Sequence, residues 1–145
     1  MSRASLLLAC LLLTATACAP KVFVREPPIP GKAFVYVYRP GGFVGWALAL
    51  PGVLTTANPP MARTFPIRPD KYVVTPVDPG VVTLATSGPD SKPVSVAISV
   101  VENTIAFIKC EMKMGWMIGG YQCQVVPQEI GEHDVARVKR NERGD

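Results

Sequence analysis

Ala33-Phe34-Val35-Tyr36-Val37-Tyr38-Arg39-Pro40 carries the strongest structural signal in this chain of 145 residues. Aromatic side chains at 34, 36 and 38 alternate with two valines, and a period of two in aromatic and β-branched residues indicates a strand. Because both sets are apolar, we expect this strand to be buried on both faces inside a sandwich. The range 39–42, with its proline and two glycines, ends it.

Similar short apolar runs, separated by proline and glycine, follow along the chain. Asp78-Pro79-Gly80 predicts a hairpin between two of them, Asn58-Pro59-Pro60 predicts another turn, and Pro76 suggests an edge position or a bulge. No helical period of core length appears after the N-terminus. The sequence therefore predicts an all-β fold, a small β-sandwich of about seven or eight antiparallel strands. Besides 34–38, the predicted strands are 46–50, 72–77, 81–86, 94–100, 104–113 and 122–126, with 53–56 and 63–67 as weaker candidates.

The N-terminus has the three parts of a secretory signal. A positive charge at Arg3 precedes an apolar run over 4–13 and the small residues 14–17. Such a run is too short to span about 30 Å of hydrocarbon permanently. Cys18 follows, and its thiolate is a nucleophile that can accept a diacylglycerol group. Cys10 is a weaker candidate, because cleavage there would leave too short an apolar region for export.

Ala15-Thr16-Ala17-Cys18 resembles the bacterial lipobox, whose first residue is usually leucine. This resemblance implies cleavage before Cys18 and a lipidated N-terminus, including palmitate, inserted in a membrane. Ala19 follows where aspartate would favour retention in the inner membrane, so the expected address is the outer membrane, facing the periplasm. The alternative is an ordinary signal peptide cut near Ala17, with Cys18 left as a free or paired thiol.

Four segments make up the expected organisation. They are a signal peptide at 1–17, forming a signal helix, the lipidated cysteine with a proline-rich extended tether at 18–32, a sandwich domain at 33–127 and a charged tail at 128–145. The tail is expected to be solvated, with a short helix over 134–140 as the alternative. Without the signal, 14 basic and 11 acidic residues are spread along 128 positions, which is no nucleic-acid footprint.

The opening strand is followed by Phe43-Val44-Gly45, by the Asp78-Pro79-Gly80 turn and by Lys113-Met114-Gly115-Trp116-Met117-Ile118-Gly119. Through these segments, the range 31–126 resembles a bacterial family known as domain-of-unknown-function 2846. The resemblance implies a small sandwich similar to transthyretin-like and PEGA-type domains, often on lipoproteins, and no activity. The range 55–61 departs from the family, whose members usually carry a turn with glycine and lysine there, and leaves the pairing of this region open.

Cys110 and Cys123 remain after Cys10 is removed and Cys18 lipidated. Two cysteines in an oxidising compartment usually form a disulfide. If 104–113 and 122–126 form a hairpin centred on Trp116-Met117, the two cysteines lie directly opposite each other, within disulfide range. Free thiols and a redox or metal role are the alternatives.

Two apolar segments flanked by glycine, 43–46 and 112–118, fall near turns where polar residues are expected. Either they fold over one end of the sandwich and pack on each other, or they form an exposed patch for lipid or a partner protein. Nearby Arg39, Lys109 and Lys113 would suit anionic head groups, although three charges are a weak signal. The patch residues are Phe43, Trp46, Met114, Trp116 and Met117.

No pattern of an enzyme appears. His133, the one histidine, lies in the tail, and the carboxylates at 70, 78, 102 and 111 read as solvated surface groups. We expect no catalytic residue, cofactor, metal or nucleic-acid partner. The favoured reading is an envelope lipoprotein with a non-catalytic binding or structural domain, whose partners are membrane lipid and an envelope protein. The alternative is a periplasmic ligand-binding or enzyme-inhibitor lipoprotein that presents the turn 112–118 to a cleft.

Overall fold

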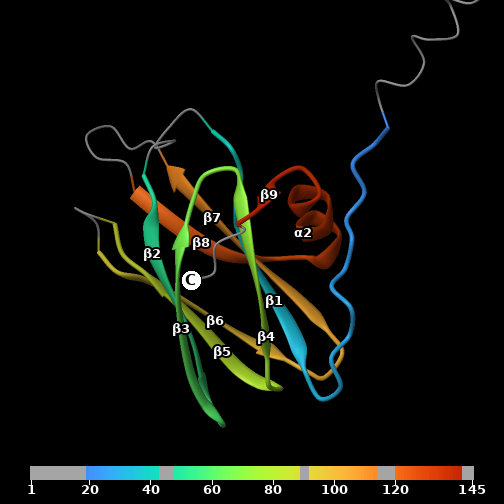
Figure 1. Cartoon of the computed structure of the whole chain (residues 1–145). Coiled ribbons are helices and arrows are strands. Elements are labelled where there is room, and N and C mark those ends of the chain that lie inside the picture. Colours follow the sequence, from blue (N-terminus) through green and yellow to red (C-terminus); the bar gives the residue numbers. More distant parts are fainter. Residues whose placement is uncertain (1–18, 43–47, 89–91, 114–119, 142–145) are drawn as a thin grey trace, which may run out of the picture.

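The chain folds as a β-sandwich, as predicted (Figure 1). The computed structural model describes residues 19–42, 48–88, 92–113 and 120–141. Within them, sheet A has the strand order β8-β7-β1-β4-β9 and sheet B the order β3-β2-β5-β6. The elements are β1 (Ala33–Arg39), β2 (Leu50–Ala57), β3 (Pro60–Ile67), β4 (Lys71–Val77), β5 (Gly80–Thr86), β6 (Val94–Val100), β7 (Ile105–Lys113), β8 (Gly120–Val126), α2 (Gln128–Val135) and β9 (Lys139–Arg140).

Most predicted strands are present, and the largest differences in their bounds lie in the range 46–67. The expected strand over 46–50 is not found in its described part, because 48 and 49 are not in a strand and β2 begins at Leu50; residues 46 and 47 lie outside the described residues. The weak candidates 53–56 and 63–67 lie in β2 and β3. These strands pair as a hairpin through the turn at Asn58 and Pro59, which settles the pairing left open for this region.

The expectation of purely antiparallel strands is wrong for two pairs. β1 runs parallel to β7, from Phe34 opposite Ile105 to Tyr38 opposite Lys109. β9 runs parallel to β4. Parallel neighbours need a long connection, and the chain between β1 and β7 passes through the whole of sheet B. No local turn signal can reveal such a pair.

The predicted hairpin at Asp78-Pro79-Gly80 is also wrong. β4 pairs with β1 and β9, whereas β5 pairs with β2 and β6, so this turn carries the chain from sheet A to sheet B. Gly80 has φ +139, a conformation that favours glycine, and Asp78 binds Lys32 Nζ at 2.8 Å. Proline and glycine specify a reversal of direction, but burial of both strands decides which partner each strand takes.

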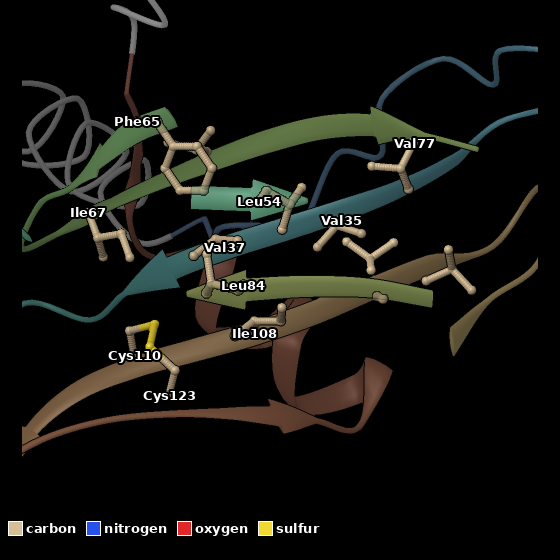
Figure 2. Packing of buried hydrophobic residues seen from close by; sticks show 14 of the residues in the cluster. Val35, Val37, Leu54, Phe65, Ile67, Val77, Leu84, Ile108, Cys110 and Cys123 are labelled. Atoms are coloured by element: carbon tan, nitrogen blue, oxygen red, sulfur yellow. A yellow bond between two sulfur atoms is a disulfide. The ribbon is translucent and has the colours of Figure 1, made fainter. Parts of the chain in front are cut away.

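The main core lies between the two sheets (Figure 2). Val35 and Val37 of β1 face this core, where they meet Leu54 and Leu84 of sheet B. Alternation along each strand supplies the inward side chains, since successive residues point to opposite faces. Further core members are Ala33, Leu50, Phe65, Ile67, Val73, Val77, Val82, Val100, Ala106, Ile108, Cys110, Tyr121 and Cys123.

A second apolar cluster covers the outer face of sheet A. Phe34, Tyr36 and Tyr38 are at most 5% exposed there, and Phe107 stacks on Tyr36 with ring centroids 5.1 Å apart. α2 covers this face and contributes Val135. The prediction that the first strand is buried on both faces is confirmed, but a helix and the N-terminal segment, rather than a sheet, cover its aromatic side.

The expectation of a solvated tail from residue 128 is wrong for the described range 128–141. This range forms α2 and β9, and Val135 is only 3% exposed. The helix lies earlier than the alternative placed it, over 128–135. α2 buries Gly131 and Val135, and two such residues among polar neighbours are too few to produce a recognisable apolar period.

Candidate functional site

The N-terminal segment is extended, as predicted, but it is not a free tether. Phe23 packs edge-on against Tyr36 and Phe107, with ring centroids 5.4 and 5.7 Å away. Glu26 donates its backbone N–H to the Tyr36 hydroxyl at 3.1 Å, and its Oε1 lies 2.6 Å from Nη1 of Arg140. We call residues 19–26 the strap. The expected spacer is thus docked on sheet A from Phe23 onward, because the exposed edge of an aromatic cluster is available to it.

The strap fixes where the N-terminus leaves the domain. Val22 and Val24 line a hollow of about 200 Å³ together with Tyr72, Val138 and Arg140. Figure 1 shows the strap passing beside α2 and leaving the molecule beyond it. Cys18 lies outside the described residues. It stands four positions before Val22, a reach of at most about 14 Å for extended chain.

Cys110 and Cys123 form a disulfide, which confirms the predicted pairing. They are directly opposed in the β7–β8 ladder, with Cα atoms 4.1 Å apart. Their exposed fractions are 0% and 6%, and Figure 2 shows the sulfur atoms directed from β7 and β8 into the core. A buried disulfide presents no thiolate to a substrate or metal, so the structure favours a stabilising role over the redox and metal alternatives.

The predicted apolar patch, Phe43, Trp46, Met114, Trp116 and Met117, lies outside the described residues and stays a prediction. The described strands that flank it are informative. β1 and β7 run parallel and side by side, so both strands finish at the same end of sheet A, at Arg39 and Lys113.

Two of the three cations named with the patch are engaged within the fold. Arg39 is 3% exposed and donates from Nη1 to the Leu48 carbonyl at 2.8 Å. Lys109 Nζ lies 2.8 Å from Glu111 Oε1 and 3.3 Å from Asp134 Oδ2. Neither side chain is therefore placed to bind head groups.

Asp134 joins α2 to sheet A, and sequence reasoning missed this contact. Its Oδ2 accepts a hydrogen bond from the Tyr38 hydroxyl at 2.8 Å, in addition to the ion pair with Lys109. His133 Nδ1 lies 3.4 Å from the other carboxylate oxygen. Tyr38 and Asp134 are 96 positions apart, so no local pattern could have paired them. The geometry is that of a structural latch for α2.

The latch gives a testable pH dependence. Burial raises the pKa of Asp134, but hydrogen bonds from Tyr38 and His133 and the charge of Lys109 outweigh it and hold that pKa below its usual value. A carboxylate with a depressed pKa stabilises the fold above its unfolded-state pKa, and this contribution is lost as the pH falls through the folded-state pKa. We expect Asp134→Asn to lower the free energy of unfolding by about 1 kcal/mol at pH 7.

Urea denaturation at pH 7 and pH 3 measures this effect. The difference between wild type and Asp134→Asn should be full at pH 7 and should shrink below about pH 4. Glu129→Gln, an exposed carboxylate of the same helix, is the matched control and should change stability by less than about 0.5 kcal/mol. Equal effects of the two variants, or a difference independent of pH, would contradict the latch.

Three of the four acidic residues weighed in the sequence make structural contacts. Asp78 pairs with Lys32, Glu102 accepts the backbone N–H of Gly31 at 2.9 Å, and Glu111 pairs with Lys109. Among the described residues, no three His, Cys, Asp or Glu side chains gather as a metal site would require. The expected absence of catalysis stays a prediction.

A shallow groove of about 330 Å³ lies where β6 turns into β7. Val101, Thr104, Val126 and Gln128 are among its lining residues, and none of the lining side chains is charged. Ligand sites usually combine apolar walls with a few convergent polar groups that orient the ligand. This groove has mainly apolar walls and no charged side chain to orient a ligand, and we assign it no ligand.

In the described part of the chain, no helix combines the length and apolar content needed to span a membrane. Comparison with known proteins finds no matching family model, no matching curated protein and no matching solved structure.

Proposed function

We propose that this chain is a cell-envelope lipoprotein. Residues 1–17 are removed, Cys18 is lipidated, and a non-catalytic binding or structural domain is held at the surface of the outer membrane, facing the periplasm. The proposal rests on one juxtaposition. Cys18 follows a signal-like segment and stands five positions before Phe23, the first side chain of the strap packed into the fold. Acyl chains on Cys18 would therefore hold the whole domain close to the membrane surface.

The buried disulfide supports export. Disulfides persist in oxidising compartments and are rare in the bacterial cytosol. Cys110 and Cys123 sit in the main core, where a reduced pair would lose a cross-link between neighbouring strands. A stable disulfide at this position suits a domain that works outside the cytoplasm.

The proposal of a non-catalytic role is supported by how the polar side chains are used. The carboxylates of Asp78, Glu111 and Asp134 bind lysines that belong to the same fold. General acid–base catalysis needs a positioned group free to exchange a proton with a substrate. These groups instead hold a turn, a strand surface and a helix.

Metabolic labelling with palmitate tests lipidation. In a Gram-negative host we expect label in the wild type and in Cys10→Ser, and loss of label in Cys18→Ser, because only the second change removes the nucleophile. Globomycin, which blocks the lipoprotein signal peptidase, should make the first two accumulate as precursor. Cys10→Ser is the matched control. Undiminished labelling of Cys18→Ser would exclude lipidation at this residue.

A further inference from the structure

Three cations stand side by side in one row at the end of sheet A. Arg39 of β1 is directly opposite Lys71 of β4, and Lys71 is directly opposite Lys139 of β9. Figure 1 shows these three strands next to one another. Like charges directly opposite each other in a sheet destabilise it. Arg39 is buried and engaged within the fold, so the repulsion that a nearby anion would relieve is that between Lys71 and Lys139.

Further positive charge surrounds this row. Arg68 precedes β4 and Arg137 precedes β9, and both are exposed. None of the ion pairs formed by the described residues involves Arg68, Lys71, Arg137 or Lys139. We call these four residues the basic end. Among the described residues in the ranges 68–71 and 137–141, Asp70 is the acidic residue, and Arg140 is already paired with Glu26.

At the opposite end of the domain, one ion pair and two hydrogen bonds to backbone groups engage the charged side chains of Lys32, Glu102 and Arg25. Lys32, which precedes β1, binds both carboxylate oxygens of Asp78 at 2.8 Å. Glu102 accepts a hydrogen bond from Gly31, and Arg25 donates to the Asn103 carbonyl at 2.5 Å. The four cations of the basic end, by contrast, lie close together in the sheet order, at the end where β1 finishes and β4 begins, and form none of the ion pairs among the described residues.

The strap leads to this same end. Val22 and Val24 line the same hollow as Tyr72 of β4 and Arg140 of β9, the residues that directly follow Lys71 and Lys139. Cys18 is within about 14 Å of Val22 along extended chain. If Cys18 carries lipid, the head groups of that membrane come within reach of the basic end.

We propose that the basic end binds the anionic phospholipid head groups of the membrane that holds the acyl chains of Cys18. This inference rests on the proposed lipidation and adds an orientation to it. Lys and Arg attract phosphate through their charge, and near an anionic surface each is worth about fivefold in affinity, reduced by salt. The domain then lies against the bilayer by one end, with the Asp78 turn pointing away from it.

Lysine footprinting on the purified, membrane-anchored chain tests this orientation. The chain is reconstituted in vesicles of neutral phosphatidylcholine, or of phosphatidylcholine with about 30% phosphatidylglycerol, a content chosen for a strong surface charge. A water-soluble acetylating reagent is added, and mass spectrometry gives the rate at each lysine. We expect Lys71 and Lys139 to react several-fold more slowly on anionic vesicles, and Lys32 and Lys92 to react equally on both. High salt should abolish the difference.

A pair of variants keeps both reporter lysines in place. Arg68→Gln/Arg137→Gln removes two charges of the basic end and should abolish the protection of Lys71 and Lys139. Arg25→Gln/Lys32→Gln removes two charges elsewhere and should leave protection intact. The proposal would be overturned if Lys71 and Lys139 reacted at the same rate on neutral and anionic vesicles. It would also be overturned if their protection on anionic vesicles survived Arg68→Gln/Arg137→Gln.

The same spectra separate this inference from the proposed function. The N-terminal peptide reports whether Cys18 carries acyl chains. An acylated peptide with unprotected lysines overturns the basic end as a lipid contact and leaves lipidation standing. An unmodified Cys18 overturns the proposed function, and protection of Lys71 and Lys139 on added anionic vesicles would then support head-group binding alone.

Discussion

Replacing Cys110 and Cys123 together by alanine is expected to lower the free energy of unfolding by about 3 kcal/mol. The disulfide joins residues 13 positions apart and closes the β7–β8 hairpin. Without it, the unfolded chain regains the conformational freedom of that loop. Both residues belong to the main core, so the loss of sulfur contacts adds to the effect. Urea denaturation of the purified domain, monitored by tryptophan fluorescence and circular dichroism, measures the change.

Reductant provides the control for this prediction. It should destabilise the wild type by a similar amount and leave the Cys110→Ala/Cys123→Ala variant unchanged, because the variant has no bond to reduce. A variant whose stability lies within about 0.5 kcal/mol of wild type would show that the cross-link contributes little. Alkylation of two thiols in unreduced periplasmic protein would show that the bond does not form in the cell.

Gly131→Ala is expected to destabilise the protein by about 2 kcal/mol, against the usual trend for helices. Glycine inside a helix normally costs about 1 kcal/mol relative to alanine, so this substitution would ordinarily be favourable. Here α2 lies directly on Phe107, and a methyl group at position 131 would overlap the side chain of Phe107. Phe107 is 1% exposed and packed by Tyr36 and Phe23, so it has little room to move. The steric overlap with Phe107 should therefore outweigh the gain in helix propensity.

Thermal unfolding of three variants tests the close contact. Gly42→Ala is the matched control, because the added methyl group there meets open space, and its midpoint should stay near that of wild type. Phe107→Leu combined with Gly131→Ala should recover part of the loss, since the ring is the obstacle; a double-mutant cycle isolates that term. Stabilisation by Gly131→Ala alone would mean that α2 packs less closely than the structure shows.

The strands themselves were predictable because their signal is local. Alternation over 34–38 and over 94–100 indicates which faces of a strand are apolar, and β1 and β6 cover these ranges. The register of Cys110 opposite Cys123 followed from a symmetric hairpin and is confirmed. Each of these features depends on residues close together in the chain.

The partners of the strands were less predictable. Asp78-Pro79-Gly80 reverses the chain direction equally well in a hairpin and in a crossing between sheets. α2 was missed because Gly131 and Val135 give it too small an apolar face to detect. Phe23 also gave no signal, since a single aromatic residue among prolines does not reveal that a cluster on sheet A will receive it.

Cys18 and its signal-like leader remain matters of sequence alone, because the proposed processing depends on a short segment outside the described residues. The class of fold and the disulfide were likewise settled by local alternation and spacing. The tertiary structure decided which end of the domain the strap leaves and which cations it gathers there. Lys71 and Lys139, two members of the basic end, are 68 positions apart in the chain and become neighbours only through the pairing of β4 and β9. Long-range strand pairing depends on the apolar surface that both sheets bury together. No short segment of the sequence carries that information.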